Sequence, residues 1–221
     1  MSRAIAVLRP EPGNRVTAAA IEARGRTAIR MPLFEVKPLA WEAPDVAGFD
    51  ALILTSANAL RHGGAGLAAL HRLPVYAVGE ATAEAALRSG FGVRLVSDEG
   101  AAALIARAEA AGVRHALHLA GRERTLETGG IIAEVIAVYA SERRTPDEVA
   151  RLAGSIALVQ SARSGAWLAE LADAQGLDRS RIALVAVSTA AAAAAGPGWQ
   201  RIIVPGVANE ALIEAAIALA D

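Results

Sequence analysis

The sequence predicts an α/β protein in which helices cover parallel sheets, and it predicts two similar halves. Runs rich in Val, Ile and Leu alternate with alanine-rich stretches along all 221 residues, a pattern typical of this class. FDALILTSANAL at 49–60 and GSIALVQSARSGAWL at 154–168 both run from an apolar stretch into a serine and then a helix-forming segment. A second matched pair lies at 75–90 and 184–196. Because 54% of the residues are hydrophobic, the chain can bury one large core or two cores of about 100 residues each.

The first elements follow from apolar runs and helix-breaking residues. Residues 4–8 (AIAVL) predict a short buried strand, and a helix follows that Gly25 ends as its C′ residue. The segment 27–39 is expected to be extended, because Pro32 and Pro38 exclude a helix around them.

The alternation of strand and helix continues to the C-terminus. Further strands are expected at 51–55, 75–78, 93–96, 115–119, 135–141, 156–160, 182–187 and 201–204. A short helix is expected to end at Gly63-Gly64, and others to span 81–89, 100–111, 162–174, 190–195 and 209–219. This order favours parallel sheets with helices on both faces, because parallel neighbours need a crossover connection.

Small polar residues follow the expected strands. In parallel α/β sheets, ligands bind beyond the carboxyl ends of the strands, where N–H groups at helix N-termini attract anions. The residues at these ends are Arg9, Thr55, Ser56, Asn58, Gly79, Thr82, Gly121, Arg122, Ser161 and Ser188. We expect them to bind an anionic ligand in a cleft between the two halves. For Ser56 and Ser161 the alternative is that the serine serves only as the N-cap of the following helix.

Several kinds of chemistry lack the residues that they need. The strand ends carry no carboxylate pair and no Ser-His-Asp set, so they indicate binding rather than general acid–base catalysis. The chain has no cysteine, no G-x-G-x-x-G after a strand and no P-loop motif. The four histidines lack metal-ligand spacing, and His115 and His118 are expected to face opposite sides of one strand. We therefore expect no metal and no cofactor.

Charge and hydropathy limit the partners. A net charge of −1 gives no general attraction to nucleic acid. Charged residues or glycine interrupt every alanine-rich stretch before it is long enough to span a membrane. The N-terminal residues enter a strand without the apolar region of a signal peptide. We expect a cytoplasmic protein that binds neither nucleic acid nor a membrane.

An ordered set of segments resembles the uroporphyrinogen-III synthase family. The segments are VLRP at 7–10, LILTSANAL at 52–60, VYAVGEATAEAALRSGF at 75–91, HLAGRER at 118–124, AVYAS at 137–141, LVQSARSGAWL at 158–168 and VPGVANEALIEAAI at 204–217. The resemblance implies two flavodoxin-like α/β domains joined by a two-stranded linker. One domain is discontinuous, 1–34 with 142–221, and 39–134 is inserted into it. The linkers are 34–38 and 135–141.

The resemblance also implies a reaction. The substrate is hydroxymethylbilane, a linear tetrapyrrole with eight carboxylates. The enzyme, a lyase of tetrapyrrole (haem) biosynthesis, closes the macrocycle with loss of water and inversion of the last pyrrole ring. The family implies a monomer without metal or cofactor. An inactive paralogue and a two-domain binding protein for a small polycarboxylate are the alternatives.

The resemblance assigns roles residue by residue. Tyr139 matches a linker tyrosine that donates a proton to the departing hydroxyl, with packing at the hinge as the alternative. The positions implied to bind acetate and propionate groups are Arg9, Thr55, Ser56, Asn58, Gly79, Thr82, Ser161 and Ser164.

Two stretches depart from the family pattern. AVSTA at 186–190 replaces a Gly-Pro-Thr-Thr turn and puts the roles of Ser188 and Thr189 in doubt. Gly129-Gly130 falls where a full helix is usual, so that helix is expected to be curtailed. The shortening puts the roles of Arg122 and Arg124 as ligands in doubt.

Overall fold

The computed structural model describes residues 2–220, which form two compact units. Unit 1 comprises Met1–Glu35 and Glu142–Asp221, and unit 2 comprises Val36–Ser141. Unit 1 is therefore discontinuous in sequence, and unit 2 lies between its two segments along the chain.

Unit 1 contains a five-stranded parallel sheet in the order β11-β10-β9-β1-β2. The strands are β1 (Ile5–Val7), β2 (Ala28–Arg30), β9 (Ile156–Val159), β10 (Ala183–Ala186) and β11 (Arg201–Ile203). The α-helices are α1 (Gly13–Glu22), α5 (Ala162–Ala174), α6 (Thr189–Ala195) and α7 (Asn209–Ala220). Short 3₁₀ helices occur at η3 (Val149–Leu152) and η4 (Arg179–Arg181).

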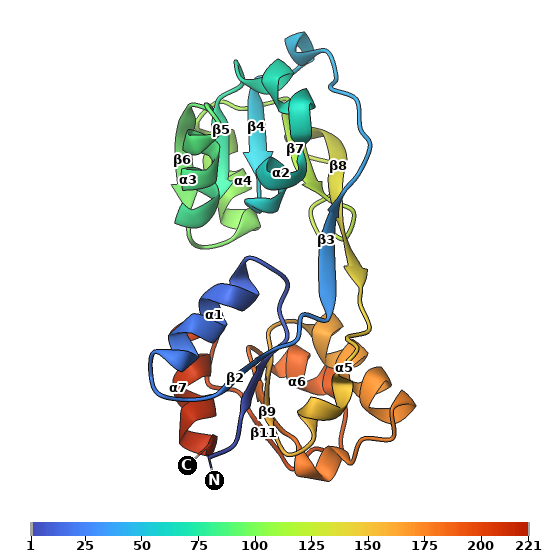
Figure 1. Cartoon of the computed structure of the whole chain (residues 1–221). Helices are drawn as coiled ribbons and strands as arrows, with labels where there is room; N and C mark the ends of the chain where they lie inside the picture. Colours follow the sequence, from blue (N-terminus) through green and yellow to red (C-terminus); the bar gives the residue numbers. More distant parts are fainter. Residues whose placement is uncertain (1, 221) are drawn as a thin grey trace. The chain divides into compact units, whose positions relative to one another are not determined.

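The strands of this sheet are buried on both faces. In β1, Ile5 and Val7 join a core with residues of α1 and α7, whereas Ala6 joins a core with residues of α5 and α6. Successive strand residues point to opposite faces, so a continuous apolar run supplies both cores. Figure 1 shows α1 and α7 on one side of the sheet and α5 and α6 on the other.

Unit 2 contains a six-stranded sheet in the order β3-β8-β7-β4-β5-β6, and its strands from β8 to β6 are parallel. The strands are β3 (Phe34–Pro38), β4 (Ala51–Leu54), β5 (Val75–Val78), β6 (Val93–Ser97), β7 (Ala116–Gly121) and β8 (Ile132–Arg143). The α-helices are α2 (Asn58–His62), α3 (Glu80–Arg88) and α4 (Ala101–Ala110). The 3₁₀ helices are η1 (Val46–Gly48) and η2 (Gly64–Leu70).

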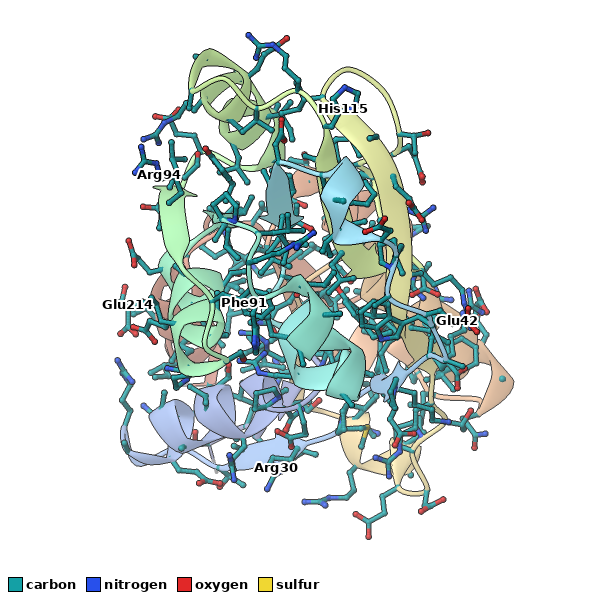
Figure 2. All side chains as sticks on the ribbon, turned by 90° about the horizontal axis from the view of Figure 1, so that it is seen from above. Arg30, Glu42, Phe91, Arg94, His115 and Glu214 are labelled. Atoms are coloured by element: carbon teal, nitrogen blue, oxygen red, sulfur yellow. The ribbon has the colours of Figure 1, made fainter. Side chains whose placement is uncertain are left out.

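The unit 2 sheet is also covered on both faces. Leu52 and Leu54 of β4 pack with residues of α2 and α3, and Ile53 packs with residues of α4. Strand β6 forms one edge, where the exposed side chain of Arg94 points away from the sheet (Figure 2). A charge on an edge strand opposes pairing with another chain.

The predicted α/β class with parallel sheets is confirmed, and α5 spans the expected 162–174. Strand β8 is longer than the expected 135–141, and η2 was not predicted. Between Gly121 and Ile132 the described chain contains no helix, which agrees with the expected shortening. In the described part of the chain, no helix combines the length and apolar character needed to cross a membrane.

Candidate functional site

The carboxyl end of β4 in unit 2 presents two hydroxyl groups. Thr55 Oγ1 shares a hydrogen bond of 3.2 Å with Nε2 of His118, a residue of the neighbouring strand β7. Ser56 Oγ accepts a hydrogen bond of 3.2 Å from the main-chain N–H of Asn58. The Asn58 carbonyl oxygen Oδ1 accepts from Arg61 at 3.0 Å. The N-cap of α2 is Ala57 and not Ser56, so Ser56 binds the first N–H of the helix from the position before the cap. Thr55 is hydrogen-bonded to a histidine.

His118 is the buried polar side chain beneath this end of the sheet. It is 0% exposed, and Nδ1 forms no hydrogen bond within residues 2–220. Burial lowers the pKa of His118 to about 4, and the charge of Arg124 acts in the same direction, while the nearby main chain of Leu126 and the charge of Glu127 raise it. The imidazole is thus neutral at pH 7. The alternation of β7 predicted that His118 lies on the opposite face from His115, but not that Thr55 is its partner.

The end of β5 turns into α3 at Gly79. Gly79 has a φ of 76°, which L side chains rarely adopt, and a Cβ added there would meet no atom within 4 Å. The space beside its Cα is therefore open to a ligand, whereas its N–H donates to the Ser97 carbonyl and its carbonyl accepts from the N–H groups of Thr82 and Ala83. Thr82, in contrast, is 5% exposed, so its side chain is part of the packing of α3 rather than of the open surface.

Tyr139 of β8 lies directly against Gly121, the last residue of β7. The two residues are register partners, and a Cβ on Gly121 would lie 2.7 Å from the Tyr139 ring and 3.0 Å from its hydroxyl oxygen. The Arg122 N–H donates to the Tyr139 carbonyl at 2.7 Å. Among the described residues the Tyr139 hydroxyl has no hydrogen-bond partner, so it is available to a ligand. Only glycine leaves room for the ring in this position.

The imidazole of His62 is the titratable group beside Tyr139. The ring centroids are 6.2 Å apart and the rings are tilted by 40°. Burial lowers the pKa of His62, and the charge of Arg61 lowers it further. Sequence reasoning missed His62, because no motif links the end of α2 to β8.

The segment from Arg122 to Ile131 replaces the curtailed helix. Arg124 pairs with Glu127 at 2.9 Å and donates to the Arg122 carbonyl at 3.2 Å. The charge of Arg124 is therefore compensated inside the segment. Arg122 itself is exposed.

In unit 1 the predicted serines are engaged as caps. Ser161 Oγ accepts from the Ser164 N–H at 3.1 Å, and Ser164 Oγ accepts from the Ser161 N–H at 3.1 Å, which forms a capping box at the start of α5. Ser188 Oγ accepts from the Ala191 N–H at 3.2 Å at the start of α6. Ser164 is buried, whereas Ser161 is exposed. Capping thus accounts for these serines locally, and Ser161 also has an exposed surface.

Arg9 follows β1, as the sequence predicted, and its guanidinium is half-buried. Nη1 lies 3.5 Å from Oδ1 of Asn209, the first residue of α7. Burial lowers the pKa of Arg9 from its ordinary value. Arg9 forms no ion pair with a carboxylate among residues 2–220, so its charge is uncompensated. Sequence reasoning did not single out Asn209.

The predicted positions therefore belong to two groups, each within its own unit. Unit 2 brings Thr55, Ser56, Gly79 and Gly121 to the carboxyl ends of its parallel strands, with Tyr139 of β8 opposite Gly121. Unit 1 brings Arg9, Ser161 and Ser188 to the corresponding ends of its strands. Hydroxyls and arginines at such ends are typical of the class of α/β proteins that bind an anionic small molecule.

A family model described as uroporphyrinogen-III synthase HemD matches residues 15–214. The chain belongs to the uroporphyrinogen-III synthase family and is an enzyme of the cyclising lyase kind.

Two solved structures share the fold over nearly the whole chain. Uroporphyrinogen-III synthetase from Helicobacter pylori is 19% identical with a TM-score of 0.64, covering 98% of this chain and 99% of that one. A mutant uroporphyrinogen III synthase from the extremely thermophilic bacterium Thermus thermophilus is 15% identical with a TM-score of 0.51, covering 99% of both chains. Comparison with curated protein sequences gave no match.

Proposed function

We propose that this chain converts hydroxymethylbilane into uroporphyrinogen III, with closure of the macrocycle, loss of water and inversion of the last pyrrole ring. Family membership supports this reaction. The local observation that supports it best is Tyr139, whose hydroxyl is unbonded within the described chain and whose ring lies against Gly121 at the end of β7.

Tyr139 is the proposed proton donor for loss of the hydroxyl. A pyrrole nitrogen supplies the electrons that break the bond between the hydroxymethyl carbon and its oxygen, and the oxygen needs a proton to depart as water. A phenol, with a pKa of about 10, keeps its proton at pH 7 and can transfer it as negative charge develops on that oxygen. His62 lies beside the ring, and its lowered pKa favours the neutral imidazole.

Geometry is the other proposed contribution. The carbocation left by water loss is attacked by the substituted carbon of the last ring, which gives a spiro intermediate. Its rearrangement inverts that ring, and the proton released on rearomatisation returns to the phenolate. Holding both ends of a flexible chain for such a closure is worth up to about 7–11 kcal/mol. Positioning is therefore a sufficient source of the preference for the inverted product.

The eight carboxylates of the substrate are the handles for positioning. We assign their direct contacts to Arg9, Arg122, the hydroxyls of Thr55, Ser56 and Ser161, and the open space beside Gly79. Gly121 is buried against the Tyr139 ring, and its proposed contribution is to leave room for that ring. The buried Thr82 and Ser164 support the main chain at these positions, and Asn58 and Ser188 act at the starts of α2 and α6. The two units are the proposed domains, with linkers at 34–38 and 135–141.

One incubation tests the function. The purified protein is mixed with enzymically generated hydroxymethylbilane, and the isomers of the product are separated. Formation of the type III isomer above the spontaneous reaction supports a synthase. Type I isomer alone at the spontaneous rate indicates an inactive paralogue or a binding protein. Light scattering tests the proposed monomer, and cell fractionation tests the proposed cytoplasmic location.

A further inference from the structure

A single side-chain oxygen in unit 1 gathers three donors. Asn209 Oδ1, at the start of α7, is 3.1 Å from Gln160 Nε2, 3.3 Å from Thr17 Oγ1 and 3.5 Å from Arg9 Nη1. Gln160 follows β9, Thr17 lies on α1 and Arg9 follows β1. Four residues from three stretches distant in sequence therefore meet beside the carboxyl ends of the adjacent strands β1 and β9.

This arrangement fixes the orientation of both amides. A guanidinium only donates hydrogen bonds, so Asn209 must present its oxygen to Arg9. Gln160 must then present its NH₂ group to the same oxygen, which leaves Gln160 Oε1 on the other side. That Oε1 is buried and accepts no hydrogen bond within the described chain. A buried acceptor without a donor is unfavourable, and it marks a place where a ligand N–H would be stabilised.

Arg9 is the second unsatisfied group of the cluster. A carbonyl oxygen has two lone pairs, so three donors exceed its capacity, and Arg9 has the longest of the three contacts. The closest acid in sequence, Glu11, is paired with Arg30 instead. The guanidinium lies on Gly13, where an added Cβ would come within 2.5 Å of Nε. Packing against Gly13 therefore fixes the Arg9 guanidinium in place, and some of its N–H groups remain free to donate to a ligand.

We propose that Arg9 and Gln160 form a subsite for one pyrrole ring that carries a carboxylate arm. The pyrrole N–H donates to Gln160 Oε1, and the carboxylate binds the Arg9 guanidinium, which suits a bidentate partner. Asn209 is a positioning residue, because it accepts from the Gln160 NH₂ group and so turns the amide oxygen toward the ligand, and Thr17 is another, because its hydroxyl holds Asn209. As a site for a ring of the linear tetrapyrrole, the subsite rests on the proposed function.

A matched pair of small ligands tests the subsite directly. One is a monopyrrole bearing an acetate and a propionate group, and the other is the same molecule methylated on nitrogen. Each is titrated into the full chain, and binding is followed by NMR through main-chain amide signals and the Gln160 side-chain NH₂. We expect the N–H compound to bind about tenfold more tightly, as one hydrogen bond to an otherwise unpaired buried acceptor predicts. If the N–H and N-methyl compounds bind the unsubstituted chain with equal affinity, the proposal is wrong.

Variants separate the two contacts. Gln160→Leu is expected to remove the preference for the N–H compound, and Arg9→Gln to weaken both compounds by about tenfold or more while keeping the preference. Arg201→Gln is the control, because Arg201 is an exposed arginine at the amino end of β11, and it should change neither affinity. Retention of the preference in Gln160→Leu would contradict the assignment.

The synthase assay is scored separately from this experiment. N–H discrimination without type III product keeps the subsite and removes the proposed reaction. Type III product without discrimination keeps the reaction and removes the subsite.

Discussion

The ring of Tyr139 occupies the space that a side chain on Gly121 would need. A Cβ at position 121 would lie 2.7 Å from two ring carbons of Tyr139, a distance that cannot persist in a folded structure. We predict that Gly121→Ala displaces the ring and lowers turnover by at least about tenfold, since small displacements of a reacting group are costly. Steady-state kinetics with hydroxymethylbilane provides the measurement.

Gly92→Ala is the matched control for this change. Gly92 lies in the same unit, and a Cβ there would meet no atom within 4 Å. Its turnover should equal that of the unsubstituted protein. If Gly121→Ala also keeps full turnover, the position of the Tyr139 ring does not matter for the reaction.

Removal of one oxygen atom tests Tyr139 as proton donor. Tyr139→Phe keeps the ring against Gly121 and deletes the hydroxyl, so turnover should fall by about 10²–10⁴-fold while the affinity for the product stays largely the same. Tyr76 is the other tyrosine of the chain and lies in the core of unit 2. Tyr76→Phe is therefore expected to leave turnover unchanged. Equal turnover of Tyr139→Phe and the parent protein would remove Tyr139 from the mechanism.

Local sequence patterns were sufficient for most of the fold. The apolar runs at 51–55 and 156–160 correspond to β4 and β9, and α5 was bounded correctly because a serine cap precedes it and helix formers fill it. The strand β8 was underestimated, because its length depends on pairing with its neighbours β7 and β3 and not on its own residues. Local patterns carry little information about such pairing.

The site was predictable only in part, for a related reason. Polar residues after strands indicated where a ligand binds, since the ends of parallel strands meet at one edge. The partner of each side chain was not predictable. In each case the partner belongs to an element distant in sequence. The pairs are Thr55 with His118, Tyr139 with His62, and Arg9 with Asn209.

The buried His118 predicts a dependence of stability on pH. Its pKa is about 4 in the folded protein and 6.5 when unperturbed. The unfolded chain therefore binds a proton first as pH falls, and folding stability decreases from pH 6.5 down to about 4. The full effect is about 3 kcal/mol. Above pH 6.5 both states are neutral and the contribution of this group disappears.

Comparison with His118→Gln isolates this contribution. Glutamine does not titrate and can still form a hydrogen bond with Thr55, and all other titrating groups are the same in both proteins. Urea unfolding at several pH values between 4 and 7.5 gives the two stability curves. They should run parallel above pH 6.5 and diverge below it, with the parent protein losing more. Parallel curves throughout would mean that His118 is accessible to protons in the folded state.

Substitutions at Ser161 separate capping from anion binding. Ser161 Oγ accepts a hydrogen bond from the Ser164 N–H, and aspartate and asparagine cap helices as well as serine does. Ser161→Ala should lower the free energy of unfolding by about 1 kcal/mol, whereas Ser161→Asn and Ser161→Asp should keep it. Aspartate also places a negative charge where we propose that a substrate carboxylate binds. Ser161→Asp should therefore raise KM for hydroxymethylbilane by about tenfold or more, and the neutral Ser161→Asn should not. Both quantities come from urea unfolding and steady-state kinetics on the same preparations, and an unchanged KM for Ser161→Asp would leave this serine as a cap alone.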